Sequence, residues 1–201
     1  TTKGNYFFGY QAGESVTTGN SLIAIGWQAL QSATSTSNNI AIGDEAGRNT
    51  TSGDANVFIG PWFAGTSNTT GSRNVFIGQL AGANNITGGT NSSFGYNAGS
   101  SISRSSDNNF FGAYSGLNLA TSSGSVIIGT SAGWGDAGAY EANNLTLLGY
   151  ETGYNLQSGA NNNIILGYSA GSDLTTGANN LLIGYNVEAP SNTASNQLNI
   201  G

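Results

Sequence analysis

The sequence repeats one short phrase along its whole length. An apolar pair or triplet followed by glycine recurs at intervals of 17, 17, 17, 18, 17, 17, 17, 20, 18, 17 and 17 residues. The twelve repeat glycines are Gly9, Gly26, Gly43, Gly60, Gly78, Gly95, Gly112, Gly129, Gly149, Gly167, Gly184 and Gly201. Most units continue with Ala-Gly and a polar turn such as Thr-Thr-Gly, so residues 1–201 form a single repetitive segment without linkers. A fixed period of this kind is the signature of stacked repeats.

The length of the unit indicates what each repeat forms. Seventeen residues are too few for two helices and their turn, and a β-branched run bounded by Gly and Asn favours a strand. We therefore predict an all-β fold, a parallel β-solenoid (β-roll or β-helix) with one coil per repeat. Coils that stack in register at about 4.8 Å would give a rod about 57 Å long.

Two neighbouring columns of apolar residues follow the repeat. The residue just before each repeat glycine is apolar in all twelve units, and we predict that this column is the structural core: Phe8, Ile25, Ile42, Ile59, Ile77, Phe94, Phe111, Ile128, Leu148, Leu166, Ile183 and Ile200. The column one residue earlier is apolar in ten units and fails at Ser93 and Asn199. Adjacent strand residues point to opposite faces, so one column should fill the coil while the other is covered from outside. Further copies of the chain are the simplest cover, which predicts a homotrimer; a wide coil with a bend here is the alternative.

Asparagine occurs four residues before the glycine in eight units: Asn5, Asn39, Asn56, Asn74, Asn91, Asn108, Asn163 and Asn180. Its amide can bond the backbone or an Asn of the next coil, so we predict a structural ladder at a turn. The repeat glycine itself is expected to supply a φ that residues with a Cβ avoid.

Composition excludes several classes of function. Ten carboxylates against four Lys or Arg give a net charge of −6, which leaves no basic face for nucleic acid. The chain has neither His nor Cys, so Ser-His-Asp and Cys-His arrangements cannot form, and we expect no enzymatic activity, cofactor or metal. The densest acidic group is Asp44, Glu45 and Asp54, which we interpret as solvated turn residues rather than paired carboxylates of a glycosidase. No apolar run is long enough to insert into a membrane.

Binding is expected where the repeat is broken, because near-identical coils offer the same surface many times. One 18-residue unit contains Pro61-Trp62-Phe63, and the 20-residue unit departs from the repeat over residues 134–141. Insertions in solenoids form outward loops that often carry binding. The candidate receptor contacts are Trp62, Phe63, Trp134, Asp136, Tyr140 and Glu141.

A third recurring feature is an aromatic residue directly after the repeat glycine in six units: Tyr10, Trp27, Tyr96, Tyr150, Tyr168 and Tyr185. Such rings suit carbohydrate or protein surfaces, but they also stack on one another along a solenoid. We favour the structural ladder as the interpretation.

Residues 23–26 (Ile-Ala-Ile-Gly) and 39–43 (Asn-Ile-Ala-Ile-Gly) resemble the head repeats of trimeric autotransporter adhesins. Residues 74–82 and the closing residues 195–201 resemble still more closely the repeats of phage tail fibres and related proteins that end in an endosialidase-type intramolecular chaperone. The resemblance implies a homotrimer. The period of 17 departs from the shorter one of the adhesin heads.

The expected function follows from the fold and the resemblance together. We expect a structural shaft or receptor-binding segment of a virion fibre, located at the virion surface and facing a host-surface glycan or protein receptor. The alternative is the head of a bacterial adhesin at the cell surface. The chain lacks Met and begins within a repeat, so we expect a segment of a longer fibrous protein. An ice-binding solenoid is a third possibility because Thr17, Thr51, Thr69 and Thr175 occupy similar positions, although Ile86, Ser122 and Gln157 interrupt the series.

Overall fold

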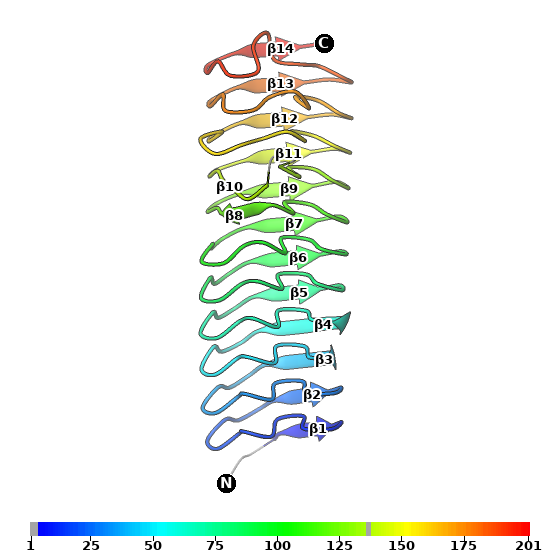
Figure 1. Ribbon diagram of the computed structural model, residues 1–201, viewed down its shortest axis with the longest axis vertical. Coiled ribbons are helices and arrows are strands. Elements are labelled where there is room, and N and C mark those ends of the chain that lie inside the picture. The colour runs from blue at the N-terminus through cyan, green and yellow to red at the C-terminus, as the bar shows by residue number, and fades with distance from the viewer. Residues whose placement is uncertain (1–3, 136–137) are drawn as a thin grey trace.

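The computed structural model describes residues 4–135 and 138–201 and confirms the parallel β-solenoid. Twelve strands, one from each predicted repeat, stack in one parallel sheet along a rod whose termini lie at opposite ends (Figure 1). They are β1 (Tyr6–Phe8), β2 (Ile23–Ile25), β3 (Ile40–Asp44), β4 (Val57–Trp62), β5 (Val75–Ile77), β6 (Ser92–Phe94), β7 (Asn109–Phe111), β9 (Val126–Ile128), β11 (Thr146–Leu148), β12 (Ile164–Leu166), β13 (Leu181–Ile183) and β14 (Leu198–Ile200). In the longest repeat, β10 (Tyr140–Glu141) pairs with β8 (Leu119–Thr121) of the preceding repeat, and the two form a second small sheet. The described residues contain no helix.

Backbone hydrogen bonds join each coil to the next in register. Ile40 is paired with Val57, and Val57 with Val75, so equivalent positions of successive repeats lie side by side. The turns are joined in the same way, as where the Gly47 amide donates to the Ala64 carbonyl at 2.9 Å. Every interior coil therefore covers the edges of its neighbours.

The repeat glycines combine an unusual backbone angle with a close approach between coils. Gly95 has a φ of 133°, and a Cβ placed on it would lie 2.7 Å from the Gly112 carbonyl oxygen of the next coil. A side chain would be strained at that φ and would also push the coils apart. The expectation that these glycines supply a φ that other residues avoid is confirmed for Gly95 and for most of its equivalents.

The predicted core column is wrong. The residues just before the repeat glycines face outward: Ile25 is 39% exposed, Ile128 37% and Leu148 49%. The interior holds the column one residue earlier, which is fully buried in ten coils: Ala24, Ala41, Phe58, Phe76, Ser93, Phe110, Ile127, Leu147, Ile165 and Leu182. The two columns do lie on opposite faces of the strand, but their assignment to interior and exterior is reversed.

Volume compensation inside the coil explains the reversal. In the second coil, Ala24 is small, and Leu22 and Leu30 fill the space around it. Where the inward residue is Phe76, the facing position is Gly82, and a Cβ there would lie 2.6 Å from the phenylalanine ring. A small inward residue is thus accompanied by large neighbours and a large one by small neighbours, so that the interior of each coil stays filled. The buried column therefore ranges in size from Ala to Phe, whereas the outward column contains only Ile, Leu and Phe.

The asparagine ladder is confirmed as a buried structural feature. The backbone amide of Asn74 donates to Asn56 Oδ1 at 2.9 Å, and the amide of Asn91 donates to Asn74 Oδ1 at 3.0 Å. Asn74 Nδ2 also donates to the Gly88 carbonyl at 2.8 Å. The Asn74 side chain thus bonds two backbone groups of the following coil, and the ladder fixes the turn before the strand in the coils that carry this Asn.

We expect Asn74→Ala to lower the free energy of unfolding by about 2–5 kcal/mol, because a buried amide and a buried carbonyl lose their partners. The matched control is Asn84→Ala, at an exposed position in the neighbouring repeat, which should change stability by less than about 0.5 kcal/mol. Denaturant unfolding of both variants measures the difference. Equal stability of the two variants would show that the ladder does not hold the coils together.

Candidate functional surface

The outward side of the main sheet is a continuous apolar surface, here called the outer face. It consists of the side chains at two positions of each strand, namely the third residue and the first residue before the repeat glycine. Examples are Ile23 with Ile25 and Ile164 with Leu166. Ile164 is 43% exposed and Leu198 65%. Tyr6, Ser92, Asn109 and Thr146 introduce polar groups among these positions. A largely apolar strip of this length is unusual on a monomeric protein and marks an interaction surface.

Aromatic residues after the repeat glycine extend the outer face at its C-terminal end. Tyr168 stacks on Tyr150 and on Tyr185 with ring centroids 5.2 Å apart in each pair and planes within 15° of parallel. The predicted structural ladder is confirmed for these three residues. Because the rings face one another, they present mainly edges to solvent.

A second aromatic stack lies beside the first and contains Trp134. Tyr114 contacts Tyr96 at 5.0 Å and Trp134 at 4.9 Å between centroids, and Trp134 stacks on Tyr154 at 5.7 Å. Desolvation, with a smaller contribution from Tyr96, raises the pKa of Tyr114. Trp134 is therefore half-buried and held between rings of the neighbouring coils.

The other candidates in the longest repeat have different positions. Tyr140 was expected as an exposed contact, and this is wrong: the side chain is 2% exposed, and its hydroxyl donates to the Gly133 carbonyl at 2.7 Å. A phenol carries enough apolar surface to fill the widened coil and needs only this one acceptor. Glu141 is exposed, and Asp136 lies outside the described residues.

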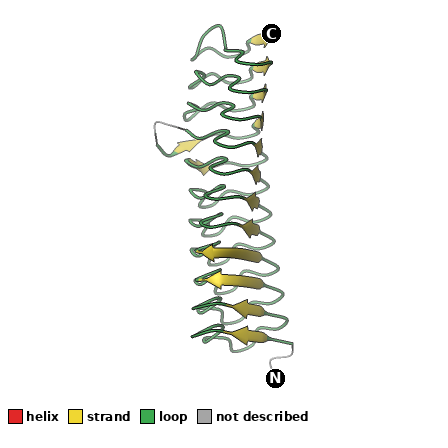
Figure 2. Ribbon diagram, turned by 90° about the vertical axis from the view of Figure 1, so that its right-hand side faces the viewer, coloured by secondary structure: helices red, strands yellow, loops and turns green. Residues whose placement is uncertain are grey.

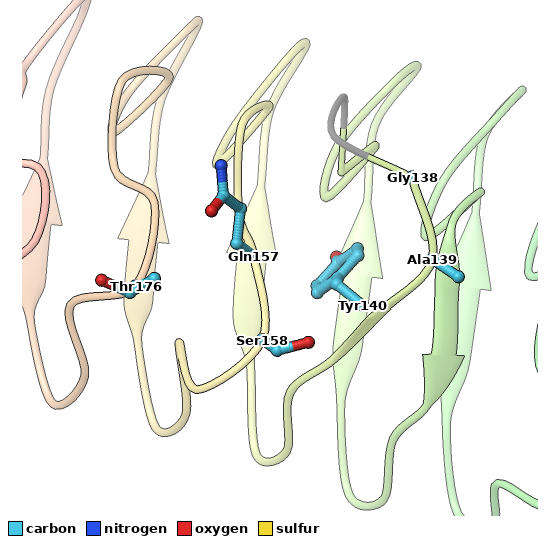
Figure 3. Close-up of a pocket in the computed structure, with 6 residues that line it drawn as sticks. All are labelled: Gly138, Ala139, Tyr140, Gln157, Ser158 and Thr176. Carbon is cyan, nitrogen blue, oxygen red and sulfur yellow. The ribbon is translucent and has the colours of Figure 1, made fainter.

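A small open pocket of about 230 Å³ lies next to this repeat. Its lining is Gly138, Ala139, Tyr140, Gln157, Ser158 and Thr176 (Figure 3). In this view the Tyr140 ring lies between Ala139 and Ser158, while Gln157 and Thr176 come from the two following coils. The lining is uncharged, and the Ser158 hydroxyl already accepts the Glu141 amide at 3.1 Å. Sequence reasoning missed the pocket because the two following coils, outside the 20-residue unit, supply half of its lining.

The break at coil four exposes its aromatic residues, as predicted. Trp62 is 52% exposed and Phe63 37%. Strands β3 and β4 are longer than their neighbours (Figure 2), and their pairing shifts so that Asp44 lies opposite Trp62. The extra residue of the 18-residue unit is taken up as a bulge at Pro61, where no ladder amide is needed.

The threonine column does not present free hydroxyls. Thr17 Oγ1 donates to the Thr34 carbonyl at 2.9 Å, and Thr34, Thr51 and Thr69 repeat this bond to the next coil. The hydroxyls donate hydrogen bonds that join the turns of successive coils. The Thr column therefore has a structural explanation and no longer favours ice binding.

The acidic residues are used locally or left in solvent. Glu45 pairs with Arg48 at 2.8 Å, and Asp54 Oδ1 accepts the Ser37 amide at 2.6 Å across a turn. Asp44 is exposed. Among the described residues, no three acidic side chains gather into a possible metal site.

Comparison with protein-family models, with curated proteins and with solved structures found no match. Residues 4–135 and 138–201 include no helix capable of crossing a membrane.

The buried phenol of Tyr140 gives a testable pH dependence. Burial raises its pKa above the ordinary tyrosine value of about 10, so the unfolded chain loses this proton at a lower pH than the folded chain. The contribution is complete below about pH 10 and is lost as pH rises further. We expect the thermal midpoint of Tyr140→Phe to fall less steeply above about pH 10 than that of the unmodified chain.

Tyr185→Phe is the matched control, because Tyr185 is 74% exposed. Its midpoint should keep the pH dependence of the unmodified chain. An unchanged slope in Tyr140→Phe would show that Tyr140 does not remain protonated in the folded rod.

Proposed function

We propose that this chain is a non-enzymatic structural and binding segment of a homotrimeric virion fibre of the phage-tail type. The observation that carries the proposal is the outer face, a largely apolar strip that no segment of residues 4–135 and 138–201 covers. The repeat resembles tail-fibre repeats over all its units, and the period of 17 separates it from adhesin heads. A rod that turns one face to identical partners and the rest to solvent suits a shaft at the virion surface.

The outer face runs along all twelve strands, which extend about 53 Å along the rod. Each strand contributes two outward side chains, so a contact between copies on this face would be long and narrow. The residue just before the repeat glycine is apolar in all twelve units, so identical rods can meet through an apolar side chain at each level of the stack.

We expect light scattering on the purified chain to give the mass of three copies. Ile77→Lys together with Ile128→Lys should dissociate the assembly, because each places a charge in the interface. Ser52→Lys together with Ser158→Lys, at exposed positions outside the sheet, should leave the mass unchanged. A mass of two copies would replace the trimer with a face-to-face dimer, and a monomeric unmodified chain would contradict the proposed assembly.

Attachment tests the binding part of the proposal. Labelled chain should bind saturably to some strains in a panel of bacterial cells. Trp62→Ala should weaken binding by about 30-fold or more, which corresponds to a hot spot of about 2 kcal/mol. Ile86→Ala removes an equally apolar and 41% exposed side chain from a regular coil and serves as the control. Binding that is lost equally in both variants, or absent on every strain, would count against a receptor contact at this break.

A further inference from the structure

Three consecutive coils place Trp27, Asp44 and Trp62 in one column at the end of the outer face. The Glu45 amide donates to the Trp27 carbonyl at 2.8 Å, and the Phe63 amide donates to the Asp44 carbonyl at 3.1 Å. Asp44 is paired with Trp62 across the β3–β4 ladder. The carboxylate therefore comes from the middle coil, with one indole on each side of it.

The two indoles differ from the other rings of this region. Tyr150, Tyr168 and Tyr185 stack on each other, whereas Trp27 and Trp62 have no ring partner among the described residues. Trp27 is 45% exposed and Trp62 52%. About half of each indole side chain is therefore open to solvent, and no other aromatic ring of the described residues stacks on it.

The Asp44 carboxylate is also unused. The neighbouring Glu45 is paired with Arg48 at 2.8 Å, and Arg48 is thereby occupied. Asp44 has no hydrogen-bond or ion-pair partner for its side chain among residues 4–135 and 138–201. An exposed carboxylate on a chain of net charge −6 attracts cations.

The spacing between the indoles fits a cation of definite size. Residues two coils apart are separated by about 9.6 Å, twice the distance between neighbouring strands. A cation held between two rings must lie within about 6 Å of each ring centroid. A compact cation with apolar methyl groups meets both conditions, because it fills the gap and loses little hydration.

The bulge at Pro61 aligns Trp62 with Asp44. In a regular 17-residue unit, position 61 would be paired with Asp44 instead of Trp62. The extra residue brings the indole into line with the carboxylate. Bulges commonly re-aim side chains at binding sites in this way.

We propose that Trp27, Asp44 and Trp62 bind a quaternary ammonium group, such as the one carried by a choline headgroup or by trimethylated lysine. This inference names a ligand class for one contact region of the proposed function and rests on that function only for its biological setting. All three side chains belong to one chain, so the site can be tested on purified protein without any cells.

The test is an NMR titration of ¹⁵N-labelled chain with tetramethylammonium chloride. The chain has three tryptophans, so it gives three indole N–H signals. The Trp27 and Trp62 signals should shift saturably with a dissociation constant of about 1 mM, and the Trp134 signal should remain still. Sodium chloride at equal ionic strength and the neutral isostere 3,3-dimethylbutan-1-ol are the ligand controls.

Asp44→Asn should weaken binding about tenfold, because it removes the charge and keeps the shape. Asp173→Asn, another exposed carboxylate distant in the sequence, should leave binding unchanged. Phosphocholine and N-trimethyllysine as further probes distinguish the two sources of the group. The site would be overturned if all three indole signals shift, if none shifts at millimolar concentrations, or if the neutral isostere binds equally well. Because the titration needs no cells, its failure can be distinguished from a failure of attachment to cells.

Discussion

Backbone hydrogen bonding between equivalent positions of successive coils is the constraint on which the structure depends. Stacking in register requires that each repeat return the chain to the same place, which the buried Asn side chains and the glycines at close approach make possible. A polar group at the turn of one coil is satisfied by the coil beside it, so no repeat is complete alone.

Stacking of the coils in register also accounts for the contrast between the interior and the outer face. The interior can vary, because Phe58 in one coil and Ala41 in another are balanced by their own neighbours. The outward column next to it is apolar in every coil, although no segment of residues 4–135 and 138–201 covers it. We propose that contacts between copies of the chain account for this difference.

The sequence predicts the period, the parallel stacking and the asparagine ladder, because each depends on residues that recur at fixed spacing. It does not predict which apolar column lies inside, since Ile25 and Ala24 are both compatible with either face of a strand and the choice depends on volume across the coil. The exposed Trp62 follows from the break in the repeat, whereas Tyr140 shares the same signal and is buried. The pairing of Asp44 with Trp62 depends on how the extra residue is accommodated, which spacing alone does not determine.

The absence of native cysteine allows the central claim to be tested directly with one spin label per chain. Ile77→Cys places the label on the outer face, and Ser52→Cys places it at an exposed turn outside the sheet. If copies of the chain cover the outer face, pulsed dipolar spectroscopy gives a short distance between chains for the label at position 77 and a longer one for position 52. No coupling between chains at position 77, or a shorter distance at position 52, would contradict the claim that this face is the interface.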